Sequence, residues 1–270
     1  MENIAFIDIF TTQNDLYGKN NSPIQFALEI FKGDEVFDEE KFIKNKCERQ
    51  KVINIIPDEH IMPLGTVISG FRDEDVNSPL YNWKSQKNAL NAIYKVLSTL
   101  KEKDVFICGF NHVAYDLTIL NSAFKRVLNL EPLEFDKNRL IDIFKIMENT
   151  VEVSEIGSYS MDSVFEYLFK DVDSLMNIRA VKSTLTDIKL TKMILHRLMN
   201  EGESFSEFLK RTSPRDDMKT LNFGKYKGAK IEDIIKIDQQ YISWILNNKT
   251  FKEQNPNLIE SINRIVSKKT

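Results

Sequence analysis

The chain has 270 residues, a net charge of −3 and 42% hydrophobic residues, which suffices for an ordinary packed core but excludes a chain coated with basic residues. Its longest apolar runs, such as residues 4–7, are far shorter than the roughly 20 residues that cross a bilayer, and the N-terminus lacks the pattern of a secretory signal. Only Cys47 and Cys108 are present, so neither a disulfide framework nor a zinc site is expected, and we expect a cytoplasmic protein.

The first part of the chain reads as strands. Residues 4–10 and 24–31 are largely apolar, and a Lys-Gly-Asp turn signal follows the second run, so the two segments predict strands of a hairpin. A further strand is expected around residues 51–55.

Helices and strands alternate after this point. The apolar residues of 88–100 recur at helical spacing, and residues 105–109 form a short apolar run typical of a buried strand. Further apolar stripes predict helices over 117–128, 161–169 and 185–199. This order predicts an α/β fold, a mixed sheet flanked by helices.

A polar break separates this pattern from the rest of the chain. Gly, Ser, Thr and Pro interrupt the apolar pattern over residues 201–217, so we expect a first domain over 1–200, a linker over 201–217 and a small α+β module over 218–270. From Pro214 onward there are 11 Lys and Arg against 7 Asp and Glu, a balance of +4, whereas the preceding residues carry −7. The C-terminal part is therefore the basic part.

Three aspartates stand at the expected ends of these elements. Asp8 closes the first strand, Asp116 follows the strand over 105–109, and Asp187 lies near the start of the last long helix. An isolated Asp in such a place is usually a turn or cap residue. Three that converge suit two-metal phosphodiester hydrolysis, because Mg²⁺ and Mn²⁺ prefer oxygen ligands.

Two motifs carry a resemblance to a known family. Residues 6–12 are similar to D-x-E-T-T, with Asp8, Thr11 and Thr12 in place, and residues 109–120 are similar to G-[YF]-N-N-V-x-[FY]-D, with Gly109, Phe110, Asn111, Val113, Tyr115 and Asp116 in place. The chain thus resembles the DnaQ-like (DEDD) 3′–5′ exonucleases over residues 3–200, and in the second motif the exonuclease I branch. Segments such as Leu-Ile-Asp-Ile at 140–143 follow in the family's order.

The resemblance implies an RNase H-like fold and hydrolysis at nucleic-acid 3′ ends, most simply those of single-stranded DNA. It implies Mg²⁺ or Mn²⁺ held by Asp8, Asp116 and Asp187. It also implies nucleic-acid contacts by Thr11, Asn111 and His112, although a neutral, hydrogen-bonded structural role is the other interpretation of His112.

Two positions depart from the family's pattern. Phe10 stands where the family has a metal-binding Glu, and Lys182 stands where it has the His that acts as general base. Phe cannot bind a cation, and a protonated Lys is a poor base. The Lys182 ammonium either takes a catalytic place beside the phosphate or is solvated on the surface. Activity is therefore expected to be weak or lost, and the alternative is a pseudo-exonuclease that binds nucleic acid or protein in a replication or repair complex.

The C-terminal residues resemble a module found in exonuclease X-like and phage-type nucleases. The sequence Leu-Asn-Phe-Gly-Lys-Tyr-Lys-Gly at 221–228 and Tyr-Ile-Ser-Trp at 241–244 carry this resemblance. Lys225, Tyr226 and Lys227 join cations to an aromatic ring, a combination that holds a phosphate backbone and stacks a base, or else forms a solvated rim. Phe223 and Trp244 are expected to form the core of the module.

Overall fold

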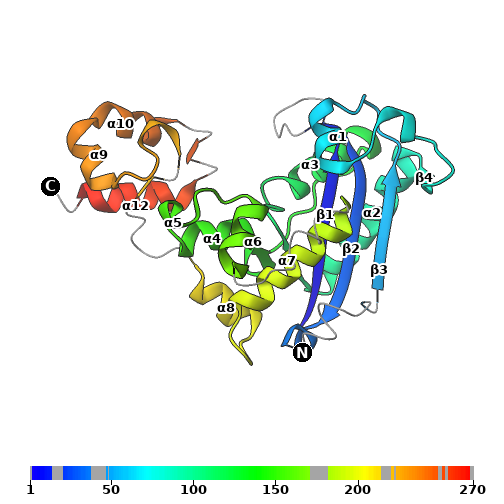
Figure 1. Ribbon diagram of the computed structural model, residues 1–270, viewed down its shortest axis with the longest axis horizontal. Helices are drawn as coiled ribbons and strands as arrows, with labels where there is room; N and C mark the ends of the chain where they lie inside the picture. Colours follow the sequence, from blue (N-terminus) through cyan, green and yellow to red (C-terminus); the bar gives the residue numbers. More distant parts are fainter. Residues whose placement is uncertain are drawn as a thin grey trace. The chain divides into compact units, whose positions relative to one another are not determined.

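The computed structural model describes residues 2–13, 21–37, 47, 49–170, 182–213, 220–221, 223–248, 251–252 and 255–267 (Figure 1). These fall into two compact units, each made of two chain segments: residues 1–143 with 168–209, and residues 144–167 with 210–270. This division assigns residues 144–167 to the unit that contains the C-terminus. The linear boundaries expected from the sequence stay a prediction.

The first unit is built on a six-stranded mixed sheet. Its strands lie in the order β4-β3-β2-β1-β5-β6, with the bounds β1 (Asn3–Thr11), β2 (Pro23–Lys32), β3 (Arg49–Ile55), β4 (Trp83–Lys84), β5 (Phe106–Gly109) and β6 (Leu140–Asp142). The first three strands form an antiparallel meander, and β5 and β6 add to β1 in parallel. The predicted hairpin, third strand and buried strand are confirmed, as is the helix-flanked mixed sheet.

Helices cover both faces of this sheet because side chains alternate along β1. Ala5, Ile7 and Ile9 point to the face where α2 (Gln86–Glu102) and α3 (Asp116–Ala123) complete a buried apolar cluster. Phe6, Asp8 and Phe10 point to the other face. There α7 (Thr184–Leu198) and α1 (Pro63–Ser69) contact β1, and Figure 1 shows α7 crossing the sheet.

The helix that carries Asp116 ends earlier than its apolar stripe suggested. The regular α-helix stops at Ala123, and the chain continues as a π-helical turn over Phe124–Leu128 that closes at Asn129 with a left-handed φ of 56°. Phe124 is fully buried in the same apolar cluster as α2. Burial of this ring explains why the apolar pattern extends beyond the α-helix.

The second unit is helical in its described residues. Its helices near the C-terminus are α9 (Ile231–Ile237), α10 (Gln239–Asn247) and α12 (Pro256–Ser267), and the earlier ones are α5 (Val153–Ile156) and parts of α4 (Ile143–Thr150), α6 (Met161–Phe169) and α8 (Phe205–Arg211). In the described part of this unit, the only β pairing is a bridge between Thr220 and Lys230. Its core is a small aliphatic cluster: Leu221, Ile231, Ile234, Ile242, Ile245, Leu258 and Ile262. Across both units, none of the described helices combines the length and apolar character of a membrane span.

Candidate functional site

The aspartates singled out by sequence come from elements that meet at one edge of the sheet. Asp8 is the sixth of the nine residues of β1, Asp116 begins α3 after the turn that follows β5, and Asp187 lies in the first turn of α7. A fourth, Asp142, is the last residue of β6. Because β1, β5 and β6 are parallel, their carboxyl ends share an edge, which is where open α/β sheets place their ligand sites.

Asp116 is the most buried of these carboxyl groups. It is 3% exposed, and its Oδ1 accepts a hydrogen bond from the backbone N–H of Ile9 at 2.9 Å, which fastens the start of α3 to β1. Burial, together with the carboxylates of Asp142 and Asp187, raises the pKa of Asp116 to about 8, against the lowering effect of the Ile9 hydrogen bond. Repelling carboxyl groups are thus concentrated at this edge.

The turn between β5 and α3 is held by Asp142. Its Oδ1 accepts from the N–H of Asn111 at 2.9 Å, and its Oδ2 accepts from the N–H of Val113 at 3.1 Å. Asn111 has a φ of 58°, a left-handed conformation that asparagine tolerates better than most residues. The sequence analysis placed Asp142 in a segment that resembles the family's sequence but assigned no role to it. An acidic residue at the end of a strand was the sequence feature that could have indicated one.

His112 is fully buried beneath this turn. Its Nδ1 lies 3.6 Å from Asp142 Oδ2, and burial lowers the pKa of the imidazole against the opposing effect of that carboxylate. The ring fits because residue 109 is glycine: a Cβ there would lie 2.6 Å from His112 Cβ. This burial favours a structural role of His112 over a nucleic-acid contact, but neither ring nitrogen has a hydrogen-bond partner among the described residues, so the expected hydrogen-bonded form is not seen.

Tyr115 joins the two motifs, and the sequence did not single it out. Its hydroxyl lies 2.7 Å from Thr11 Oγ1 and accepts a hydrogen bond from Asn21 Nδ2 at 3.3 Å. Burial raises the pKa of Tyr115, and the carboxylates of Asp116 and Asp8 raise it further. Asp8, Asp116 and Thr11 therefore surround one phenol, so the two sequence motifs meet in space.

The two substituted positions have structural partners of their own. Phe10 is 4% exposed and packs in an apolar cluster with Ile24, Ile61 and Phe71. Lys182, just before α7, is exposed, and its Nζ donates to the carbonyl of Val67 in α1. The ring of Phe10 is therefore part of the core, and the ammonium of Lys182 binds a helix carbonyl.

The negative charge of these carboxyl groups suits a divalent cation, but the distances between them do not. A cation would relieve the repulsion that raises the pKa of Asp116, because Asp and Glu oxygens are the ligands that Mg²⁺ and Mn²⁺ prefer. Within the described ranges, however, no three His, Cys, Asp or Glu side chains are grouped closely enough to hold one ion. Binding would require these carboxyl groups to come closer together.

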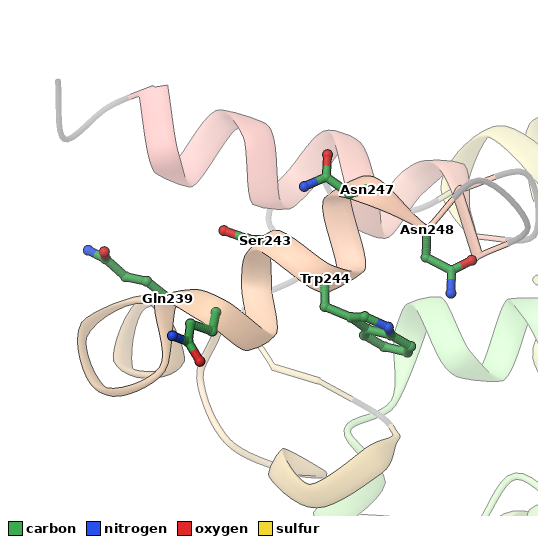
Figure 2. A pocket seen from close by; sticks show the side chains of 6 residues that line it. Gln239, Ser243, Trp244, Asn247 and Asn248 are labelled. Atoms are coloured by element: carbon green, nitrogen blue, oxygen red, sulfur yellow. The ribbon is translucent and has the colours of Figure 1, made fainter.

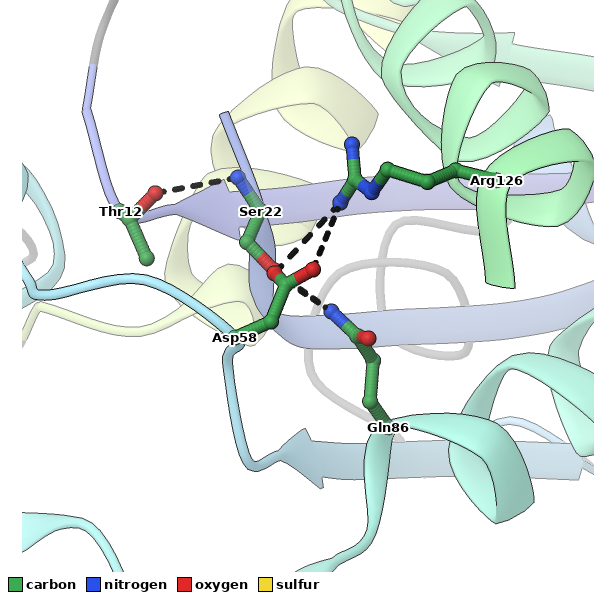
Figure 3. A network of polar contacts seen from close by, with 5 residues as sticks. All are labelled: Thr12, Ser22, Asp58, Gln86 and Arg126. Atoms are coloured by element: carbon green, nitrogen blue, oxygen red, sulfur yellow. Dashed lines mark hydrogen bonds and ion pairs between the residues drawn. The ribbon is translucent and has the colours of Figure 1, made fainter. Parts of the chain in front are cut away.

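A polar network fixes the chain that follows β1 (Figure 3). Gln86 Nε2 donates to Ser22 Oγ and to Asp58 Oδ1, both at 2.8 Å, and Arg126 approaches Asp58 Oδ2 at 3.3 Å. Burial alone would raise the pKa of Asp58, but hydrogen bonds from Ser22 and Gln86 and the charge of Arg126 lower it. Thr12 joins the network because its Oγ1 accepts from the N–H of Ser22 at 3.0 Å. The partners lie far apart in sequence, so sequence patterns could not reveal them.

In the C-terminal module, Asp238 holds two of the three residues expected to contact nucleic acid. Lys225 Nζ lies 2.7 Å from Asp238 Oδ2, and the hydroxyl of Tyr226 donates to the same oxygen at 2.9 Å. These hydrogen bonds, that of Lys225 foremost, lower the pKa of Asp238 to about 2. Lys227 is exposed.

Trp244 was expected to form part of the module's core, and this expectation is wrong. It is 50% exposed and stacks on Tyr241 with ring centroids 5.9 Å apart, whereas Phe223 packs against the aliphatic cluster as expected. Figure 2 shows Trp244 beside amide side chains of the same helix, and together they line a shallow groove: Gln239, Gln240, Ser243, Trp244, Asn247 and Asn248. The residue lies near the end of α10, where one side of its ring has no core to cover it.

Two comparisons with known proteins agree with this architecture. Residues 221–250 match a family described as exodeoxyribonuclease X-like C-terminal, which supports the expected identity of the module. Over 78% of its length, the chain is similar to 43% of E. coli exonuclease I in the zinc-bound form of its complex with single-stranded DNA, with 14% identity and a TM-score of 0.57. For the complex with a dA16 oligonucleotide the identity is 15%, the TM-score 0.57 and the coverage 78% and 43%.

At such identities the likeness establishes the fold, and the expected RNase H-like exonuclease fold is confirmed. The chain spans less than half the length of the exonuclease I chains that it matches. No curated protein sequence gives a significant match.

Proposed function

We propose that the chain acts on the 3′ ends of single-stranded DNA as a weak, metal-dependent 3′–5′ exonuclease. The observation that carries the proposal is the set of carboxyl groups at the carboxyl ends of β1, β5 and β6, where Asp142 and Asp187 raise the pKa of the buried Asp116. This set lies in a fold like that of E. coli exonuclease I, which has been solved with single-stranded DNA. Action on DNA is in keeping with a cytoplasmic protein, including a host cytoplasm if the source is a phage.

Each residue of the site has a proposed task. Asp8, Asp116 and Asp187 would hold Mg²⁺ or Mn²⁺ once their carboxyl groups come closer together, and such an ion would activate water and stabilise the leaving oxygen. Thr11, whose hydroxyl meets that of Tyr115, and Asn111, whose N–H donates to Asp142, contact the terminal nucleotide. Asp116 must lose its proton to bind a cation, so activity should rise with pH through about 8.

Phe10 and Lys182 account for the weakness of the activity. Phe10 adds no carboxylate and is fixed in its apolar cluster, so fewer negative charges offset the cation. Lys182 binds the carbonyl of Val67, which is consistent with its solvated-surface interpretation rather than with a catalytic one. The site thus has no general base in the place where the family has histidine.

The test is digestion of a 5′-fluorescein-labelled single-stranded 20-mer with Mn²⁺ at several pH values, analysed on a sequencing gel. We expect slow shortening from the 3′ end that Asp187→Asn abolishes. The surface variant Asp233→Asn is the matched control and should leave the rate unchanged. Shortening that survives Asp187→Asn would assign the activity to a contaminant and contradict the proposal.

The second candidate is a catalytically inactive binding module in a replication or repair complex. The burial of Phe10 favours it, because the place of one metal ligand is now part of the core. This alternative predicts that the 20-mer is bound, as measured by fluorescence anisotropy, but never shortened in Mg²⁺ or Mn²⁺. The two measurements on the same oligonucleotide separate the candidates.

We propose that Lys225, Tyr226 and Lys227 give the C-terminal module its contact with the DNA strand. Lys227 is exposed, and the ammonium of Lys225 lies over the rings of Tyr226 and Tyr241 at 4.8 and 5.4 Å. Lys227→Ala should weaken binding of the 20-mer and make its salt dependence shallower, because one phosphate contact is lost. The control Lys236→Ala lies on α9 and forms a surface ion pair with Asp233. Equal effects of the two substitutions would contradict a role for this turn.

A further inference from the structure

A groove in the surface of the first unit lies away from the aspartates. It has a volume of about 710 Å³ and lies on the α2 face of the sheet, between α2 and the strands β2 and β3. Asn3, at the start of β1, and Val105, just before β5, line one end of it. These are the amino ends of the parallel strands, whereas Asp8 and Asp116 lie toward the carboxyl ends. The groove is therefore distinct from the candidate exonuclease site.

Two rows of cationic side chains form the walls of the groove. Lys95 lies on α2, and Lys103, eight residues further on and about 12 Å along the helix axis, follows the last residue of this helix. Arg49 and Lys51 lie two residues apart on β3, so both project from the same face of the sheet, about 7 Å apart. Among the described residues that line the groove, none is Asp or Glu. This is a local cationic surface on the part of the chain with a balance of −7.

The floor between these rows is apolar. Leu28 and Ile30 of β2 and Val96 and Leu100 of α2 supply it. Ile30 and Val96 are only partly buried, so apolar surface remains accessible between the cations. An aliphatic floor between two cationic walls requires a ligand that combines apolar groups with negative charges on both sides.

We propose that this groove binds a short acidic peptide segment of a partner protein, with an aliphatic side chain of the peptide on the floor and carboxylates on either side of it. The carboxylates face Lys95 and Lys103 on one wall and Arg49 and Lys51 on the other. The distribution of charge favours this ligand over a fatty acid, whose single carboxylate lies at one end of an apolar chain.

The floor also disfavours a nucleic-acid strand. Binding of single strands depends on aromatic rings on which bases stack. The one aromatic side chain among the described lining residues, Phe31, is 3% exposed and packs edge-on against Phe6 with ring centroids 6.0 Å apart. The face of the Phe31 ring is therefore not available for stacking with a base. We infer that the cationic side chains of the groove bind a chain that carries carboxylates.

The experiment uses the full chain and fluorescence anisotropy. The probe is a fluorescein-labelled peptide, Glu-Asp-Leu-Asp-Glu-Leu-Asp-Glu, and a second peptide carries Ser in place of both Leu. We expect the double variant Lys95→Glu with Lys103→Glu to weaken binding of the first peptide about tenfold or more, because the carboxylates of the peptide then face carboxylates on that wall of the groove. Replacement of the leucines should weaken binding by a similar factor, since the floor then gains no apolar contact.

Lys101→Glu is the control, because it reverses the charge of one lysine at an exposed position of α2 outside the groove. It should leave the affinity within about twofold. Val96→Ser tests the floor without a charge change and should weaken the leucine peptide only. Circular dichroism checks that each variant is folded. Equal peptide affinity of the double variant and Lys101→Glu would overturn the proposal, as would displacement of the peptide by laurate or by an oligothymidylate at equal concentration.

Discussion

Replacement of Asp116 by asparagine tests the central feature of the site, the carboxyl group whose pKa is raised to about 8. At pH values below about 3.8, its ordinary pKa, both the folded and the unfolded chain keep this proton. As the pH rises toward 8 the unfolded chain loses the proton and the folded chain keeps it, so this group makes the free energy of unfolding fall over that range. Asparagine does not titrate, and its Oδ1 can still accept the hydrogen bond from Ile9.

The magnitude follows from the size of the pKa change. A rise from 3.8 to about 8 corresponds to about 6 kcal/mol at roughly 1.4 kcal/mol per unit, if nothing relaxes. Water entry and rearrangement of the neighbouring Asp142 and Asp187 reduce this upper bound. We therefore expect the free energy of unfolding of Asp116→Asn, relative to that of the natural chain, to increase by about 2 kcal/mol from pH 5 to pH 8.

The assay is urea unfolding at pH 5, 6, 7 and 8, followed by tryptophan fluorescence. The chain has two tryptophans, Trp83 in the first unit and Trp244 in the second, so a Trp244→Phe background leaves Trp83 to report on the unit that holds Asp116. Glu134→Gln, an exposed residue of the same unit, is the matched control. A stability difference between Asp116→Asn and the natural chain that does not change with pH would refute the reasoning.

Two glycine substitutions test the close approaches on which each unit depends. Gly109→Ala should lower the free energy of unfolding by about 1–3 kcal/mol, because the new Cβ would lie 2.6 Å from His112 Cβ in a packed core; a midpoint in urea unchanged from the natural chain would contradict that packing. In the C-terminal module, Gly224→Ala should destabilise more than Gly228→Ala in thermal melts followed by Trp244 fluorescence. Both glycines have a positive φ, but only at Gly224 would a Cβ also meet a side chain, Tyr241 Oη, whereas the space around Gly228 is open; equal losses would show that backbone strain alone matters.

Local patterns in the sequence were sufficient to predict most of the fold. The alternating residues of 4–10 and 24–31 became the central hairpin, and the helical spacing over 88–100 became α2. The second motif was likewise sufficient to place Asp116 at the start of a helix, whereas Asp8, expected to close its strand, lies three residues before the end of β1. These features depend on neighbours along the chain, through dihedral preferences and the burial of one face, so the sequence contains them directly.

The roles of the substituted and buried residues depended on the tertiary structure. In the motif, Phe10 stands where the family has a metal ligand. In the structure its ring completes an apolar cluster with residues more than ten positions away in the sequence. From the motif, His112 was one candidate for a residue that faces the cleft. In the structure it is enclosed by the backbone of Gly109 and the carboxylate of Asp142. Trp244 reads as core, yet its position near the end of α10 leaves half of it exposed.

The sequence by itself determined the order of the strands and helices, the two motif aspartates and the basic balance of the C-terminal part. Only the tertiary structure decided which acids act on one another, because the pKa of Asp116 depends on burial and on carboxylates 26 and 71 residues further along the chain. The cationic groove was equally out of reach of a sequence pattern. In the sequence, Lys95 and Lys103 look like ordinary surface lysines. In the fold they lie opposite Arg49 and Lys51, and such long-range proximity depends on packing rather than on local spacing.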